Sequence, residues 1–172
     1  MLLVKGVKRA KTKYVISVEK FADDLIMISV VNEDYKCEVP SYWRLTKTFG
    51  NPPLEIGVDC QSGLIVGITA FISEVLSSES FVNTIVPISD DVIVDTSIFS
   101  KTNDYIDVDQ GYKVYINDVK MMFCFGDNQE PEKIFRSDRL ELYIDNYNQI
   151  IGFSLCDLSK DEVALMVNLK QH

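Results

Sequence analysis

The stretch "LEIGVDCQSGLIVGITAF", residues 54–71, is repeated in outline by "LELYIDNYNQIIGFSLCDL", residues 140–158. Each copy reads Leu-Glu, an apolar run that ends in Asp, a polar turn, and a second apolar run that contains Gly. The second copy begins half the chain length after the first. Alternation with a period of two around a polar turn is typical of a half-buried β-hairpin.

The two hairpins align residue by residue up to their turns. Glu55 aligns with Glu141, and Asp59 aligns with Asp145; the turn is then one residue shorter in the second copy. We interpret the pattern as two similar halves, about 1–86 and 87–172, each contributing a small antiparallel sheet. One such sheet cannot bury its apolar face alone. The sequence therefore predicts a single domain in which the two halves pack as a sandwich.

An alternative is that any two amphipathic hairpins look alike. Asp59 and Asp145 each precede a turn, and a carboxylate in this position can accept hydrogen bonds from the backbone N–H groups of the turn. Gly67 and Gly152, in the outgoing strands, predict a β-bulge or a close approach of another backbone. Neither feature requires a duplication, so both explanations stay open at this stage.

The rest of the chain also follows the strand period. Val, Ile, Tyr and Phe, which favour strands, dominate the apolar runs. We expect strands over 13–20, 24–31, 35–39, 54–59, 64–73, 81–89, 91–99, 112–118, 119–125, 140–145, 149–158 and 162–169. This predicts a mainly β protein with antiparallel sheets and at most a few short helices. Trp43, the single tryptophan, is expected to anchor the core.

Two kinds of local signal refine this map. The pairs Gln110-Gly111 and Asn117-Asp118 are expected to form hairpin turns. Ser159 and Glu162 have the spacing of a capping box, which would begin a helix. The apolar residues that follow alternate with a period of two, and this favours a strand over 162–169; a helix is the alternative.

Composition limits the class of protein. The apolar fraction of 47% is ordinary for a globular protein, so a core can form without staples. No apolar run approaches the ~18 residues that a membrane span needs. The N-terminus has too short an apolar run for a secretory signal, so we expect a soluble, cytoplasmic protein. The four cysteines are widely spaced and the single histidine is His172, so we expect neither a metal site nor a cofactor.

The net charge of −9 is unevenly distributed. Residues 1–86 hold nine basic and ten acidic side chains, whereas residues 87–172 hold eight and sixteen. One interpretation is that acidity serves solubility. The other is an acidic face for a basic protein partner, because such a field speeds encounter. Direct nucleic-acid binding is disfavoured, since neutralising phosphates requires a basic surface.

Residues that carry familiar catalytic chemistry are missing from the sequence. With one histidine at the extreme terminus, no Ser-His-Asp or Cys-His arrangement can form. No glycine-rich nucleotide loop is present. Counted from Asp107, a calcium loop would need glycine at its sixth position, but Gly111 is the fifth. Two carboxylates alone can serve a glycosidase, but acids are plentiful in any acidic chain. We therefore predict a protein that is not an enzyme.

The phrase "PLEIGVDCQSGLIVGIT", residues 53–69, resembles a motif of small bacterial immunity proteins. These proteins are encoded beside polymorphic or contact-dependent toxins and neutralise them. The resemblance covers this hairpin and its partial echo, and the length, acidity and β-rich character are similar too. It implies a mechanism without chemistry, in which an acidic surface docks on the basic face of a cognate toxin, such as a nuclease.

The clustering of acids supplies candidates for this contact. Asp90, Asp91, Asp95, Asp104, Asp107 and Asp109 are expected to meet the toxin, with Tyr105 as an aromatic anchor. The competing interpretation is a structural or adaptor β domain that associates with itself. The oligomeric state stays open, because nothing in the sequence determines it.

Overall fold

The structure is a computed structural model that describes residues 1–9, 11–47, 51–74, 76–77, 85–117, 119–126 and 130–167. These residues form fourteen strands, one 3-10 helix and one α-helix. The strands are β1 (Val4–Arg9), β2 (Tyr14–Ala22), β3 (Leu25–Asn32), β4 (Ser41–Leu45), β5 (Leu54–Val58), β6 (Ile65–Ile72), β7 (Leu76–Ser77), β8 (Asp90–Val94), β9 (Tyr105–Val108), β10 (Tyr112–Ile116), β11 (Lys120–Phe125), β12 (Lys133–Ser137), β13 (Leu140–Ile144) and β14 (Ile150–Cys156). The helices are η1 (Thr96–Ile98) and α1 (Lys160–Val167).

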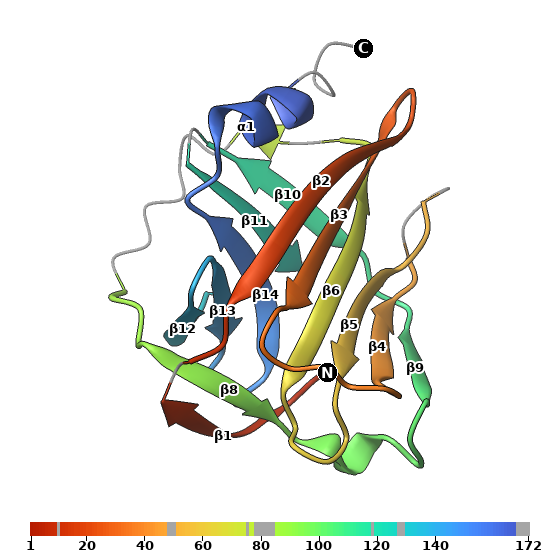
Figure 1. Cartoon of the computed structure of the whole chain (residues 1–172), viewed down its shortest axis with the longest axis vertical. Coiled ribbons are helices and arrows are strands. Elements are labelled where there is room, and N and C mark those ends of the chain that lie inside the picture. Colours follow the sequence, from red (N-terminus) through yellow and green to blue (C-terminus); the bar gives the residue numbers. More distant parts are fainter. Residues whose placement is uncertain are drawn as a thin grey trace.

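Two six-stranded sheets and a two-stranded ribbon make up the fold (Figure 1). The first sheet has the order β2-β3-β6-β5-β4-β9, and the second has the order β12-β13-β14-β11-β10-β7. The ribbon is the antiparallel pair β1-β8, which lies at the end of the molecule opposite α1 (Figure 1). The prediction of a mainly β protein with antiparallel sheets is confirmed; the pairs β4-β9 and β7-β10 are parallel.

The two halves fold with the same strand order. In the first half, five strands run β2-β3-β6-β5-β4 across the sheet, and in the second half β10-β11-β14-β13-β12 repeat that path. The repeated hairpins β5-β6 and β13-β14 therefore occupy equivalent places. A shared order over five strands goes beyond what two look-alike hairpins would produce, so the halves are structurally similar.

The aspartates of the repeated motif act alike. Asp59 accepts hydrogen bonds from the backbone N–H groups of Gln61 and Ser62. Asp145 accepts them from Tyr147 and Gln149. Each carboxylate thus satisfies turn donors that the strand ladder leaves unpaired, as the sequence predicts.

A bulge occurs at the same point in both hairpins. The register shifts between Gly57 and Val58 in the first hairpin, and between Tyr143 and Ile144 in the second. The glycines of the outgoing strands make the predicted close approach. A Cβ on Gly67 would lie 3.1 Å from the carbonyl oxygen of Val30, and one on Gly152 would lie 2.3 Å from that of Phe123.

The inner faces of the two sheets share one core. Trp43 from the first sheet is fully buried, and its ring lies 5.7 Å from that of Phe125 in the second sheet. Phe123 and Phe153 stack at 4.3 Å within the second sheet. The expectation that Trp43 anchors the core is confirmed, because it packs where the two apolar faces meet.

The halves are interlocked, which the boundary at 86/87 does not anticipate. Strand β7 follows the first half's hairpin but joins the second sheet, whereas β9 of the second half joins the first sheet. In the ribbon, Val4 of β1 pairs with Val94 of β8. From this point β1 contacts the turn of the second-half hairpin, and β8 contacts the turn of the first-half hairpin. Val4 N–H donates to the carbonyl of Asn148, and Val94 N–H donates to that of Gly63. The two acceptors are equivalent turn residues with φ of 59° and 73°.

The expected strand over 162–169 is wrong within the described residues, because α1 covers Lys160–Val167. The capping box decides the conformation. Ser159 Oγ accepts from Glu162 N–H at 3.2 Å, and the Glu162 carboxylate accepts from Ser159 N–H at 2.6 Å. Met166 is fully buried whereas Leu165 is exposed, so the apolar residues follow the helical spacing.

The turn predictions have different outcomes. The side chain of Asn117 accepts from the N–H groups of Val119 and Lys120, between the paired strands β10 and β11, so this hairpin turn is confirmed. Gln110-Gly111 is not a hairpin turn, because it links β9 of the first sheet to β10 of the second. The expected strand over 35–39 is wrong, because these residues form the loop between β3 and β4. In the strand expected over 81–89, residues 85–89 hold only an isolated bridge at Ile88. Residues 81–84, Asp118 and residues 168–169 lie outside the described residues. No helix in the described part is long and apolar enough to span a membrane.

Candidate functional site

The outer face of the first sheet is open, and strand register arranges its side chains in rows across the sheet. One row consists of two valines, two glycines and two tyrosines: Val15, Val31, Gly67, Gly57, Tyr42 and Tyr105. The next row is polar: Ser17, Ser29, Thr69, Glu55, Arg44 and Asp107. The alternation of the strands creates these rows, because every second residue points away from the core.

A groove of about 650 Å³ runs over this face. Gly57 and Gly67 leave its floor low because they carry no side chains. The valines form one wall and Tyr42 forms the other, while Glu55 and Thr69 add polar groups. Pockets that bind ligands commonly combine apolar walls with a few polar groups. We call this hollow the open groove.

Aromatic and charged side chains are stacked beside the open groove. The rings of Tyr42 and Tyr105 stack at 5.3 Å with an interplanar angle of 15°. The guanidinium carbon of Arg44 lies 4.8 Å from the centre of the Tyr105 ring. Arg44 also donates two hydrogen bonds to the carboxylate of Asp107, of 2.6 and 2.9 Å. Tyr105 is 48% exposed, so the stack presents an aromatic surface to solvent. The contacts with Tyr42 and Arg44 restrict the conformation of the Tyr105 side chain.

The loop between β3 and β4 closes one end of the open groove. Tyr35 Oη donates to the carboxylate of Asp59 at 2.7 Å, and Cys37 Sγ lies 3.6 Å from the other carboxylate oxygen. Asp59 is 5% exposed. Burial alone would raise the pKa of Asp59, but hydrogen bonds from Ser62, Tyr35 and Gln61 outweigh it and lower this pKa to about 2. The turn of the first hairpin therefore holds the rim of the groove.

This arrangement predicts a loss of stability in acid. The pKa of Asp59 is depressed in the folded protein relative to the ordinary value of 3.8, so its contribution is fully present above that value. It is lost as the pH falls through about 2. We expect the urea midpoint of the wild type to fall over this interval, and that of Asp59→Asn to start lower and to fall less. Parallel curves for the two proteins would contradict the assignment.

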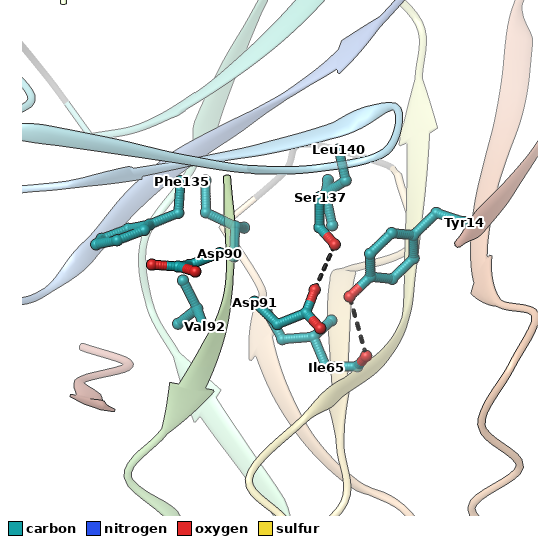
Figure 2. Close-up of a pocket in the computed structure, with 9 residues that line it drawn as sticks. Tyr14, Ile65, Asp90, Asp91, Val92, Phe135, Ser137 and Leu140 are labelled. Atoms are coloured by element: carbon teal, nitrogen blue, oxygen red, sulfur yellow. Dashed lines mark hydrogen bonds between the residues drawn. The ribbon is translucent and has the colours of Figure 1, made fainter. Parts of the chain in front are cut away.

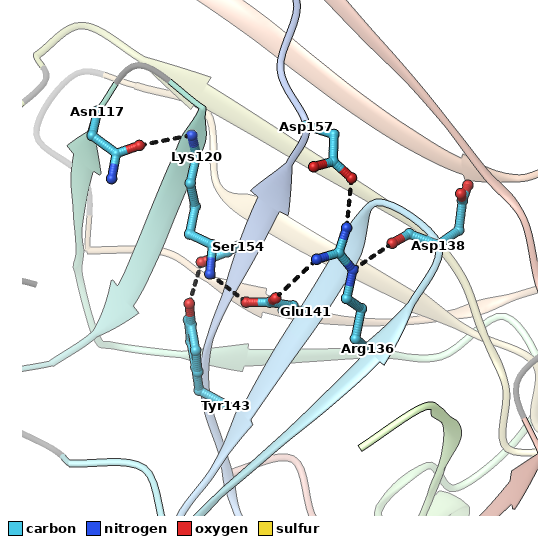
Figure 3. Close-up of polar contacts among 8 residues, drawn as sticks. All are labelled: Asn117, Lys120, Arg136, Asp138, Glu141, Tyr143, Ser154 and Asp157. Atoms are coloured by element: carbon cyan, nitrogen blue, oxygen red, sulfur yellow. Dashed lines mark hydrogen bonds and ion pairs between the residues drawn. The ribbon is translucent and has the colours of Figure 1, made fainter. Parts of the chain in front are cut away.

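The equivalent face of the second sheet is covered. Met122, Ile134, Tyr143 and Ile151 are buried there, and Met1 and Ile85 pack against them. Tyr143 occupies the motif position of Gly57, so a ring fills the place that is hollow in the first sheet. Its hydroxyl pairs with Ser154 (Figure 3).

Glu141, the counterpart of Glu55, is 2% exposed and paired (Figure 3). Its carboxylate is 2.6 Å from Lys120 Nζ and 3.6 Å from an Arg136 nitrogen. Arg136 also meets Asp157 at 2.5 Å. In the first sheet, Arg44 is 3.6 Å from Glu55, which repeats the Arg136–Glu141 contact. One arginine–glutamate pair thus recurs in both halves, once open and once covered.

The predicted toxin-binding residues fall into separate places. Asp104, Tyr105, Asp107 and Asp109 lie on or beside β9, the edge strand next to the open groove. We call these four residues the acidic edge. Asp95 lies apart, at the start of η1, where it accepts from Ser97 N–H at 3.0 Å. Asp90 lies on β8, which pairs with β1 in the ribbon.

Asp91 does not belong to an exposed contact surface. It is 3% exposed and lines a small enclosed cavity between the halves (Figure 2). Its carboxylate accepts from Thr12 Oγ1 at 2.9 Å, from Lys11 N–H at 3.2 Å, and from Ser137 Oγ. The consecutive residues Asp91 and Val92 are both buried, so both faces of β8 are covered at this point. The Asp91 carboxylate therefore joins the two halves instead of meeting a partner.

The described residues offer no cluster of three or more histidine, cysteine or acidic side chains that would hold a metal ion. The cysteine thiols are free. Burial raises the pKa of Cys124 to about 11 and that of Cys156 to about 12, so these two thiols stay protonated at neutral pH.

Comparison of the chain with models of protein families and with curated proteins finds no match. The site includes residues that the sequence did not single out, among them Tyr42, Arg44, Glu55 and Gly57. Glu55 and Gly57 hold alternate positions of one expected strand, which indicated a shared face, whereas Tyr42 and Arg44 lie outside every expected strand. No signal in the sequence indicated that this face is open.

Proposed function

We propose that this chain is a binding protein without catalytic activity that neutralises a cognate bacterial toxin. The open face of the first sheet, with its acidic edge, is the contact surface in this proposal. The observation that carries it is the difference between two equivalent faces of one molecule. The second is covered by the chain itself, whereas the first leaves stacked tyrosines, a hollow and carboxylates exposed to a partner.

Charge and surface chemistry favour a basic protein as that partner. The net charge is −9, and Asp107 and Asp109 are exposed at the edge of the first sheet. Such carboxylates steer a basic protein toward the surface from a distance. Tyrosine and arginine are enriched where protein interfaces bind most strongly. A toxin that acts on nucleic acid has a basic face of this kind, so the acidic edge would occupy the place of phosphates.

The first experiment is capture of the partner from the source cell on the immobilised chain, followed by elution with salt. The captured protein is then purified, and its toxicity is measured in cells with and without this chain. The proposal requires a single basic partner whose toxicity the chain relieves. Self-association alone, seen by sedimentation, would favour the adaptor domain instead.

Neutralising the acidic edge is expected to slow capture. With Asp104, Asp107 and Asp109 replaced by Asn, the association rate with the captured partner should fall about tenfold at low salt, because steering is lost. The matched control replaces three exposed acids elsewhere: Asp24, Glu130 and Asp161. Stopped-flow rates at several salt concentrations measure the effect. Equal rates for the two triple variants would remove the acidic edge from the interface.

A further inference from the structure

Glu55 in the open groove lacks a cation that its counterpart has. In the covered half, Glu141 is held by Arg136 at 3.6 Å and by Lys120 Nζ at 2.6 Å. In the open half, Arg44 repeats the first contact at 3.6 Å, and the described residues provide no second cation within ion-pair distance of Glu55. The open half therefore lacks a counterpart of Lys120, which is the closer of the two cations around Glu141.

Strand register shows which residue replaces Lys120. Gly152 pairs with Cys124 of β11, and Lys120 lies four residues before Cys124. Gly67, the counterpart of Gly152, pairs with Val31 of β3, and Met27 lies four residues before Val31. Met27 thus stands where Lys120 stands, and it has no charge to offer Glu55.

The space for a cation is present as well. In the covered half, the Tyr143 ring fills the site beside the glutamate, whereas Gly57 carries no side chain there. Tyr42 and Val66 border this position, 3.3 and 3.4 Å from where a Cβ of Gly57 would lie, and the open groove adjoins it. Tyr42 lies between Tyr105 and Gly57 in its row, so the face of its ring that is turned from Tyr105 looks onto the groove. Aromatic rings attract ammonium groups.

Arg44 does not neutralise Glu55 fully, because its short hydrogen bonds go to Asp107. The side chain of Glu55 is 31% exposed and borders the groove. The groove also has a lysine of its own, Lys36, on the rim loop; within the described part of the chain it forms no ion pair with Glu55. A carboxylate with spare acceptor capacity thus faces an unfilled hollow.

We infer that the open groove takes a lysine side chain of the partner protein, whose ammonium group pairs with Glu55 as Lys120 pairs with Glu141. The second half is the template, since it shows the same carboxylate with its cation in place. This inference rests on the proposed function for the identity of the partner, and it names the side chain by which that partner is recognised. Charge-assisted hydrogen bonds of this kind are short and strong.

The test uses tetralysine as the probe, with fully acetylated tetralysine as its uncharged control. Binding is followed by the ¹⁵N–¹H spectrum of the whole chain. Tetralysine should shift the amide signals of Gly57, Gly67 and Thr69, and the acetylated peptide should not. Shifts that spread evenly over the acidic surface would overturn the inference.

Three variants sharpen the result. Glu55→Gln should weaken tetralysine binding about tenfold, because it removes a charged acceptor. Met27→Lys should weaken it similarly, since the new lysine supplies the missing ammonium from within. Glu19→Gln, which removes one exposed charge from the same face, should stay within about twofold of the wild type. Equal affinities for Glu55→Gln and Glu19→Gln would overturn the inference, and Met27→Lys tests it independently if Glu55→Gln does not fold.

The outcome can be separated from that of the proposed function. If tetralysine enters the groove but no toxin is captured, the lysine site stands and toxin neutralisation falls. If a toxin is captured and Glu55→Gln releases it no faster than Glu19→Gln does, toxin neutralisation stands and the lysine site falls.

Discussion

Asp91→Ala is expected to destabilise the fold by about 3 kcal/mol, the largest loss we expect from removing a polar side chain of this protein. The Asp91 carboxylate is 3% exposed and accepts from Lys11 N–H, Thr12 Oγ1 and Ser137 Oγ. Alanine leaves these donors without their acceptor at a site where the carboxylate itself is almost fully buried. The enclosed cavity beside Asp91, about 10 Å³, has room for one water molecule at most.

The same change should loosen the contact between the halves. Thr12 precedes β2 of the first sheet, Ser137 ends β12 of the second, and Ser137 Oγ also lies 3.2 Å from the Thr12 carbonyl. Urea unfolding measures the loss of stability. Asp109→Ala is the matched control: this aspartate is exposed, so its removal should change stability by less than about 0.5 kcal/mol. Similar midpoints for the two variants would show that the buried carboxylate does not hold the halves together.

Gly152→Ala is expected to be the most damaging single-methyl addition, at about 3 kcal/mol. Its Cβ would lie 2.3 Å from the carbonyl oxygen of Phe123, and both atoms belong to central strands of the second sheet. Relief requires β11 and β14 to move apart, which strains the ladder and the packed face beneath it. Thermal unfolding and the near-UV spectrum of the aromatic core report this strain.

The duplicated hairpin provides the control for this substitution. At Gly67 the equivalent contact, to the Val30 carbonyl, is 3.1 Å, so a shift of a few tenths of an ångström accommodates alanine. Gly67→Ala should therefore cost about 1 kcal/mol, the lower end of the range for overpacking. A result in which Gly67→Ala is as harmful as Gly152→Ala would mean that closeness to the carbonyl does not set the cost.

The repeated motif made the fold predictable to a useful depth. Alternation indicated strands, and the shared Asp and Gly indicated equivalent turns and close contacts. The structure confirms both features. The prediction of a C-terminal strand was wrong because two local signals conflicted. Alternation favoured a strand, but Ser159 and Glu162 form reciprocal capping hydrogen bonds that begin α1. Met166 falls outside that alternation, and it faces inward together with Val163, three residues before it, at helical spacing.

The candidate site was predictable only in part. Charge clustering indicated Asp104, Asp107 and Asp109 near Tyr105, and these residues lie together on or beside β9. It also grouped Asp91 with them, because a sequence gives the charge of a side chain but not its burial. Glu55 was visible as half of a repeated Leu-Glu pair, yet nothing local distinguished it from Glu141.

By itself, the sequence determined the period of the strands, the likeness of the two hairpins, and the residues that share a face, since these follow from local geometry and the pleat. Tertiary structure alone decided which of the two outer faces is covered. Ile85 and Met1 pack on the outer face of the second sheet and leave that of the first sheet open. Which face is covered therefore depends on where segments distant in the sequence pack. Packing between segments far apart in the chain makes Glu141 a buried ion-pair partner and leaves Glu55 at the edge of an open groove.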